Sequence, residues 1–308
     1  MIENTLWGQE MYRETALVIL IFIALVSTPF YFLKNRSTQH LAIWASFKSW
    51  FFYAPAVFVL FSFPKPWPLI FLTLASIFAS KIFFQMVGMY HRTWFIWITY
   101  FFLVLTSYIV YADYGWAYNL IPMIFMGCLW FIPLLRNSPK HMIQYIALST
   151  MAFMFFGWSL LHLIRMYDLE KGIYMVIYIY VLSEVAENSN ILFNTFFGKR
   201  KFFTNIANYV SLEGVAFSIF FTVLVAWAMR HLLPVRSEAY WLSAGLVCSI
   251  IGLIGNLIIT VVRRDLKIKP SGIFIIGRGD IVDRLDKMIF IAPVFFYMFL
   301  YLQTGSPF

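Results

Sequence analysis

The sequence predicts an all-α integral membrane protein that crosses the bilayer about ten times. Of its 308 residues, 62% are hydrophobic and only 12% are charged, whereas soluble domains carry about 25% charged residues. So few charges cannot cover a water-exposed surface, and most of the surface must therefore contact lipid. Ten apolar runs have spanning or near-spanning length. They cover residues 15–33, 49–64, 67–88, 94–112, 116–135, 142–164, 172–196, 210–232, 239–262 and 287–303.

The segments between these runs have the composition of loops, such as the proline-rich FPKPWP at 63–68 and the basic GKRKF at 198–202. The second run and the last are shorter than the roughly 20 residues that a spanning helix needs. No internal repeat is visible. We expect one continuous membrane domain, in which residues 1–170 form N-terminal helices without motifs and residues 171–308 form the C-terminal region that carries the site.

The positively charged residues predict the orientation of the chain. If both termini lie on the non-cytoplasmic side, sixteen of the 23 Lys and Arg residues fall on the cytoplasmic side and six fall outside. An excess of Lys and Arg marks cytoplasmic loops, so we expect this orientation, with the loop at 263–287 in the cytoplasm of a bacterium and the helices in its inner membrane. The same bias accounts for the net charge of +9, and no nucleic-acid partner is expected.

The seventh run contains two carboxylates, Glu184 and Glu187, within the segment SEVAENSN. Their spacing of three residues puts both on one helix face. A charged residue within a span costs roughly 2.5–3.5 kcal/mol, so such residues mark candidate functional sites. The pair could hold a divalent cation, position a base or share a proton. Two other interpretations stay open: the segment lines a wet cavity in the cytoplasmic half of its helix, or it relays protons or cations in a transporter.

Further charged residues gather in the last third of the chain. Glu213 lies in the first turn of the eighth span, where the helix dipole favours an acid and where a catalytic role is also open. The loop at 263–287 is rich in glycine and in charges of both signs, and its Arg and Lys side chains suit phosphate. Asp283 and Asp286 could ligate a metal or cap the last helix, and Asp280 adds a carboxylate. This convergence at one membrane face predicts a phosphate-handling site.

The stretch from Glu187 to the C-terminus resembles the phosphatidate cytidylyltransferase (CDP-diacylglycerol synthase) family. The closing signature of that family has a Lys-Arg pair, a Lys-Asp pair, a glycine-rich loop with a His, and Asp-Arg-x-Asp. The residues at these positions are Arg263-Arg264, Lys269, Gly277-Arg278-Gly279 and Asp283-Arg284-Leu285-Asp286. Upstream, an acidic residue followed by Phe-Gly-Lys and then by Glu-Gly corresponds to Glu187, Phe197-Gly198-Lys199 and Glu213-Gly214.

The resemblance implies transfer of CMP from CTP to a lipid phosphate, which forms a CDP-lipid and releases pyrophosphate. It implies Mg²⁺ as the cofactor, held by Glu187, Asn256 and Asp283. The implied catalytic residues are Glu187, Asp283 and Asp286. The implied phosphate-binding residues are Arg263, Arg264, Lys269, Arg278 and Arg284. The expected partners are membrane lipids, the lipid phosphate and CTP, and either a second copy of the chain or a membrane complex.

The sequence departs from the family pattern mainly at carboxylate positions. The Asp of a Gly-Asp pair in the ninth span is Asn256, the Glu three residues later is Ile259, and the Asp of the Lys-Asp pair is Pro270. Ile and Pro side chains cannot ligate a metal, and neutral oxygens hold a divalent ion weakly. Glu184 and Asp280 could restore part of the charge. A second hypothesis is therefore a catalytically degraded relative that binds anionic lipid or nucleotide, or serves as the membrane subunit of a complex.

Overall fold

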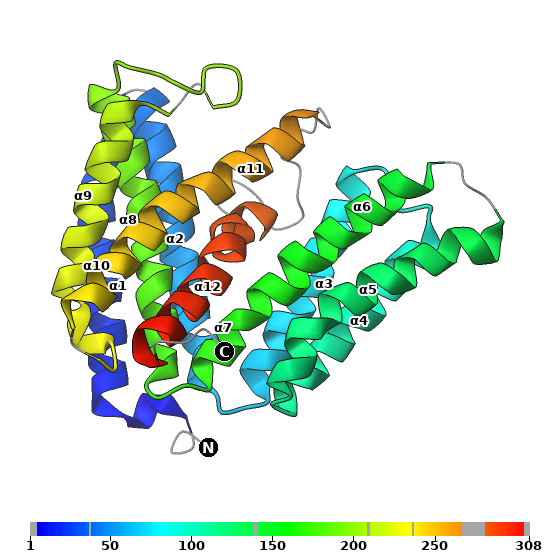
Figure 1. The fold of residues 1–308 in the computed structure, drawn as a ribbon. Coiled ribbons are helices and arrows are strands. Elements are labelled where there is room, and N and C mark those ends of the chain that lie inside the picture. Colours follow the sequence, from blue (N-terminus) through cyan, green and yellow to red (C-terminus); the bar gives the residue numbers. More distant parts are fainter. Residues whose placement is uncertain are drawn as a thin grey trace. The chain divides into compact units, whose positions relative to one another are not determined.

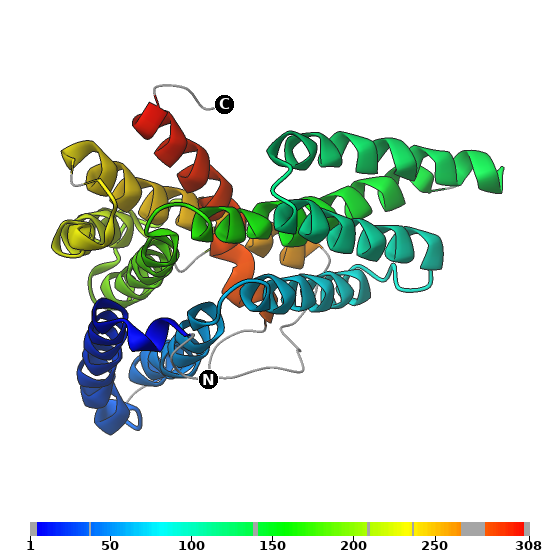
Figure 2. The same ribbon diagram turned by 90° about the horizontal axis from the view of Figure 1, so that it is seen from below.

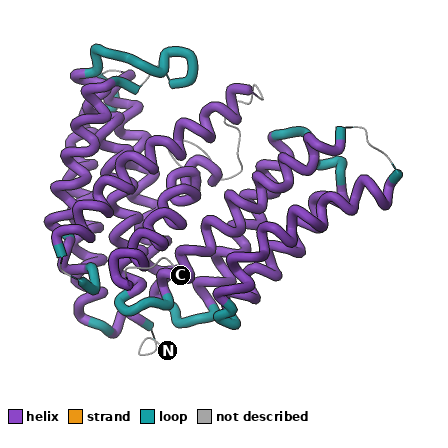
Figure 3. The backbone as a smooth tube through the Cα atoms, viewed as in Figure 1, coloured by secondary structure: helices purple, strands orange, loops and turns teal. Residues whose placement is uncertain are grey.

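The described part of the chain folds into helices and short connections. The computed structural model describes residues 5–36, 38–137, 141–207, 210–235, 237–265 and 281–304, and the side chains of residues 38, 39, 42 and 281–284 lie outside this description. Figure 3 shows no strand in these ranges, where the β-type pairing is a single bridge between Lys201 and Ser211. The predicted all-α fold class is therefore confirmed.

The α-helices of the described residues are labelled in chain order in Figure 1. Their bounds are α1 Glu10–Leu33, α2 Thr38–Ser62, α3 Trp67–Met86, α4 Thr93–Tyr111, α5 Gly115–Arg136, α6 Met142–Ala152, α7 Leu160–Tyr167, α8 Gly172–Phe197, α9 Leu212–Ala228, α10 Glu238–Leu246, α11 Gly252–Asp265 and α12 Ile281–Thr304. Two π-helical segments, η3 (Phe153–Ser159) and η5 (Val247–Ile251), join α6 to α7 and α10 to α11. Short 3-10 turns form η2 (Leu6–Gly8) and η4 (Arg230–Leu232).

Eight helical stretches in the described residues are long and apolar enough to cross a membrane, which confirms a polytopic membrane protein. Two of the ten predicted spans fall outside this set. Helix α9 has 17 residues, and α8 contains the polar SEVAENSN segment, which lowers its mean hydropathy. The count of ten spans and the orientation of the termini stay predictions.

Two helices extend well beyond the apolar runs that predicted them. Helix α2 begins at Thr38 rather than near residue 49, and α12 begins at Ile281 rather than at residue 287. The hydropathy of a run detects apolar composition, whereas a helix continues through polar residues that other helices hold. The loop predicted at 263–287 is correspondingly shorter, because its first three residues end α11 and its last seven begin α12.

The chain forms two compact units. Unit 1 comprises Met1–Trp67 and Met166–Phe308, and so combines α1 and α2 with α8 to α12. Unit 2 comprises Pro68–Arg165, which covers α4, α5, α6 and η3 with most of α3 and α7. In the sequence, nothing in residues 1–170 indicated that α1 and α2 belong to the same unit as α8 to α12.

Aromatic packing fills the interior of unit 2. The rings of Phe125 and Phe153 lie 4.3 Å apart between centroids, and Phe102 meets both of them edge-on. A Cβ atom at Gly157 would lie only 2.4 Å from the side chain of Leu103, so glycine lets the π-helical segment η3 approach α4 closely. This unit carries none of the predicted site residues.

Helix α8 is the central helix of unit 1. Sixteen of its 26 residues are buried. It contacts α2, α9, α11 and α12, which are labelled in Figure 1 and drawn from below in Figure 2. The hydroxyl of Tyr178 donates to the carbonyl of Ala226 at 2.9 Å, and that of Ser218 donates to the carbonyl of Ala186 at 2.6 Å. These bonds tie α9 to α8, so the polar segment of α8 is enclosed by other helices.

Candidate functional site

Lys287 of α12 lies between the two carboxylates that the sequence singled out on α8. Its ammonium nitrogen Nζ is 2.7 Å from Oε1 of Glu184 and 2.6 Å from Oε2 of Glu187. The side chains of Lys287 and Glu184 are only 3% and 5% exposed, and that of Glu187 is 21% exposed. The prediction that Glu184 and Glu187 share one helix face therefore agrees with the structure, in which one lysine contacts both.

The depth of this cluster makes its pairing energetically important. Glu184 lies twelve residues after the start of α8, which at 1.5 Å per residue is about 18 Å along the helix, and its side chain is only 5% exposed. Charges removed from water must be paired with good geometry, because an unpaired charge in such surroundings costs several kcal/mol. Lys287 supplies this pairing to both carboxylates.

Helix α2 contributes a further polar contact to the same segment of α8. The hydroxyl of Ser46 donates to Oδ1 of Asn188 at 2.9 Å, and the amide of Asn188 donates to the carbonyl of Glu184 at 2.8 Å. All three residues are buried. The sequence identified Asn188 as a neighbour of the carboxylates, but it gave no sign that Ser46, more than 140 positions earlier, would reach it.

Helix α11 approaches α12 closely at the position that the sequence marked as Gly255-Asn256. A Cβ atom at Gly255 would lie 2.8 Å from the ring of Phe290 and 3.0 Å from the carbonyl oxygen of Asp286. Glycine therefore permits this approach, which brings the amide nitrogen of Asn256 to 3.3 Å from Oδ2 of Asp286. The other oxygen of Asp286 accepts the backbone N–H of Lys287 at 2.6 Å.

The two arginines at the end of α11 point in different directions. Arg263 follows Asn256 by seven residues, which is two helical turns, so it lies on the same face about 10 Å further along the axis. Arg264 is exposed, and its Nη1 donates to the carbonyl of Asn205 at 2.8 Å. Of the predicted phosphate-binding pair, Arg263 thus lies on the face of α11 that carries Asn256, whereas Arg264 contacts the loop before α9.

Glu213 and Asn194 organise that loop. The carboxylate of Glu213 accepts the backbone N–H groups of Lys199 and Arg200 at 3.2 and 3.1 Å. Asn194 accepts the backbone N–H of Ser211 at 2.7 Å, and Ser211 caps α9 by accepting the N–H of Gly214 at 3.1 Å. Glu213 therefore lies in the first turn of α9 as the sequence predicted, with its carboxylate on backbone donors.

Several predicted site residues fall outside the described residues. Lys269, Arg278 and Asp280 belong to the segment 266–280. Asp283 and Arg284 lie in the first turn of α12, but their side chains are not described. Their roles stay predictions.

The family resemblance implies a divalent cation, and the described residues show which donors are available to hold it. Among them, no three His, Cys, Asp or Glu side chains come together in a way that could hold a metal ion. Glu187 is bound to an ammonium group, Asn256 directs an N–H toward Asp286, and Ile259 is apolar and buried. The donors that the structure describes therefore do not fit a divalent cation.

Sequence reasoning missed two members of the site, Ser46 and Lys287. Lys287 was assigned to a cytoplasmic loop, although it directly precedes the apolar run MIFIAPVFFY. A lysine at that position has to be paired if its helix starts earlier, and the two carboxylates of α8 were the available partners. Ser46 had no such signal, because it lies before the apolar run predicted at 49–64, and a serine within a helix usually bonds the backbone of its own helix.

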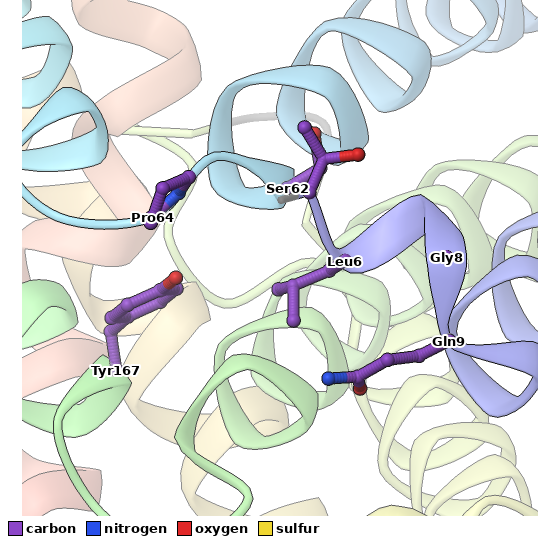
Figure 4. A pocket seen from close by; sticks show the side chains of 7 residues that line it. Leu6, Gly8, Gln9, Ser62, Pro64 and Tyr167 are labelled. Carbon is purple, nitrogen blue, oxygen red and sulfur yellow. The ribbon is translucent and has the colours of Figure 1, made fainter. Parts of the chain in front are cut away.

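A cavity of about 490 Å³ lies near the other end of α8 (Figure 4). Its lining includes Leu6, Gln9, Ser62 and Tyr167, and none of the described residues that line it is charged. The hydroxyl of Tyr174, in the first turn of α8, donates to Oε1 of Gln9 at 3.4 Å. Tyr174 precedes Glu184 by ten residues, or about 15 Å of helix, so this cavity is separate from the charged cluster.

Comparison with known proteins places this geometry in context. Residues 44–302 match the cytidylyltransferase family, a match that begins far upstream of the residues on which the predicted resemblance rests. The uncharacterised protein YnbB of Escherichia coli K12 is 26% identical over 243 residues, or 67% of this chain and 80% of that protein.

Relatives from several bacteria carry the name phosphatidate cytidylyltransferase. The enzyme of Staphylococcus aureus (strain COL) is 25% identical over 178 residues, which is 57% of this chain and 66% of the enzyme. The enzyme of Bacillus subtilis 168 is 25% identical over 156 residues, which is 50% of this chain and 58% of the enzyme. The chain thus spans less than two thirds of the length of these two enzymes. The predicted family resemblance is confirmed.

Proposed function

Because the chain belongs to the cytidylyltransferase family, we propose that it transfers the CMP group of CTP to a lipid phosphate, forming a CDP-lipid and pyrophosphate. The observation that carries the proposal is the cluster of buried Glu184, Asp286 and Lys287 with the partly exposed Glu187, where α8 meets α12. Ionisable side chains at membrane depth are expensive and are retained for function. Membership of an enzyme family favours catalysis over the transporter interpretation. Phosphatidate is the first acceptor to test, since two relatives are named for it.

The reaction needs little covalent chemistry from the protein. An oxygen of the lipid phosphate attacks the α-phosphorus of CTP, and the bond from that phosphorus to the oxygen bridging to the β-phosphate breaks, so pyrophosphate leaves with the electron pair. The protein has to align the two anionic groups and stabilise the charge that develops. We assign phosphate binding to Arg263 with Arg264, Lys269, Arg278 and Arg284, whose guanidinium and ammonium groups suit phosphate oxygens.

The carboxylates of the cluster are assigned to positioning. Asp286 accepts from the amide of Asn256 and from the backbone of Lys287, so it fixes α11 against α12 beside the arginines. The family activity is usually associated with a divalent cation, but the described donors do not fit one, and we route no step through it. Asp283, whose side chain is not described, stays the predicted further carboxylate of the site.

We place this site at the cytoplasmic face of a bacterial inner membrane. The support is the excess of Lys and Arg on that side of the predicted spans and the need for access to cytoplasmic CTP. A lipid phosphate in the same leaflet would reach the site laterally.

The test is an assay of the purified protein in lipid–detergent micelles with labelled CTP and a panel of lipid phosphates. We expect a labelled CDP-lipid and a matching amount of pyrophosphate. Asp286→Asn should lower turnover by roughly 100-fold, whereas Lys201→Ser, which removes a single charge of the opposite sign from an exposed loop position, should retain it. If no lipid phosphate in the panel is converted, the proposal fails.

A second candidate is favoured by the residues that replace carboxylates. Asn256 and Ile259 stand at two acidic positions of the family pattern, and Lys287 already neutralises Glu187. A relative with these features would bind nucleotide or anionic lipid without turnover, or serve as a membrane subunit. Calorimetric binding of CTP together with an absence of CDP-lipid would support it, and any CTP-dependent turnover would exclude it.

A further inference from the structure

Two separate contacts supply the carboxylates of the cluster with donors from the protein itself. The ammonium group of Lys287 is 2.7 and 2.6 Å from Glu184 and Glu187. On the other side of α12, the amide of Asn256 is 3.3 Å from Asp286. These contacts involve three helices, α8, α11 and α12, and they meet on α12 at the adjacent residues Asp286 and Lys287.

The ammonium group of Lys287 occupies the position between Oε1 of Glu184 and Oε2 of Glu187 where a bridging metal ion would bind. Magnesium binds carboxylate oxygens at about 2.0–2.1 Å and calcium at about 2.3–2.6 Å. Lys287 reaches one oxygen of each glutamate at hydrogen-bonding distance. An ion bound to those two oxygens would therefore be in steric and electrostatic conflict with the ammonium group.

The cluster still carries more negative than positive charge, and this excess would by itself attract a divalent cation. The geometry decides against that cation at the glutamates, because a cationic group already contacts both. The amide of Asn256 has a similar consequence for Asp286. A second carboxylate at position 256 would require a cation or a proton between the two groups, whereas an amide donates directly to Asp286.

We infer that the ammonium group of Lys287 is the permanent cation of this site and holds Glu184 and Glu187 in the place where a divalent cation would otherwise bind. Lys287 is therefore a positioning residue, and the two glutamates are not metal ligands. The inference rests on the proposed function in so far as the cluster belongs to the nucleotide-binding site. It differs from the set of metal ligands that the family resemblance implied.

The test measures Mn²⁺ binding to the purified protein by electron paramagnetic resonance, without CTP. The variants Glu184→Gln and Glu187→Gln should each bind as much Mn²⁺ as the unsubstituted protein. Lys287→Ser should create an additional Mn²⁺ site that disappears again when Glu184→Gln is added. Lys201→Ser removes one positive charge from an exposed loop position, and it should create no such site.

Two results would overturn the inference. One is a loss of Mn²⁺ binding in Glu184→Gln or Glu187→Gln while Lys287 is present. The other is a folded Lys287→Ser protein that binds no more Mn²⁺ than the unsubstituted protein. If Lys287→Ser does not fold, the two single glutamate variants still decide the question, because both keep the lysine. None of these measurements uses turnover, so a failure of the proposed cytidylyl transfer would leave the result readable.

Discussion

Two lysine–carboxylate pairs in unit 1 have the same chemistry but different surroundings. Lys287 and its partners Glu184 and Glu187 lie where α8 meets α12, and the side chains of Lys287 and Glu184 are only 3% and 5% exposed. Lys65 pairs with Asp168 in the connections near the start of α8, where the two side chains are 26% and 30% exposed. Water can solvate both members of the second pair when it separates, whereas Lys287 and Glu184 are almost completely shielded from it. The comparison indicates that burial, rather than the type of contact, determines how much the fold depends on an ion pair.

The largest effect is expected for Lys287→Met. The substitution keeps the length of the side chain but leaves two glutamates without their cation, which should lower the free energy of unfolding by about 3–5 kcal/mol. Thermal unfolding in detergent measures the loss. Adding Glu184→Gln and Glu187→Gln should recover most of it, because the two carboxylates that lost their cation are then replaced by neutral amides. A stable Lys287→Met protein would remove the distinction between the two pairs.

The next effect concerns the close approach of α11 and α12 that holds Asn256 beside Asp286. In Gly255→Ala, the new methyl group would overlap the ring of Phe290 and the backbone of α12, and the stability should fall by about 1–3 kcal/mol. Gly127→Ala is the matched control, because a Cβ atom there has no neighbour within 4 Å. Equal unfolding temperatures for the two variants would contradict the predicted packing.

A smaller effect is expected for Ser46→Ala. The variant removes the donor that α2 offers to Asn188, so a buried amide oxygen loses a partner, at a cost of about 1 kcal/mol. Thr222→Val is the control: its hydroxyl donates to the carbonyl of Ser218 in its own helix, and its loss should change stability less. The opposite ranking in thermal unfolding would show that α2 does not support the cluster.

The smallest effect is expected for Lys65→Met. An ion pair near solvent contributes about 0.2–1 kcal/mol, so the unfolding temperature should stay close to that of the unsubstituted protein. The measurement is the same thermal unfolding as for Lys287→Met, with Lys48→Met as a second exposed lysine for reference. A loss as large as that of Lys287→Met would mean that burial does not separate the two pairs.

Much of the site was predictable because charged residues are rare in this sequence. Glu184 and Glu187 stood out within an apolar run, and Asn256 and Asp286 stood out through the family pattern. The bounds of the loop were less predictable. Hydropathy ends a run where charged residues cluster, whereas α12 continues through Asp286 and Lys287 because α8 and α11 provide partners for both.

The sequence by itself determined that this chain is helical and embedded in a membrane, since its composition leaves no other solvent for its surface. It also determined which carboxylates had to be functional or paired. Only the tertiary structure decided which residues pair with these carboxylates. Ser46 reaches Asn188 across the bundle and Lys287 reaches both glutamates, because partners in a helical bundle are set by how helices pack. Helices of similar apolar composition contain almost no information in their sequences about which helices pack together.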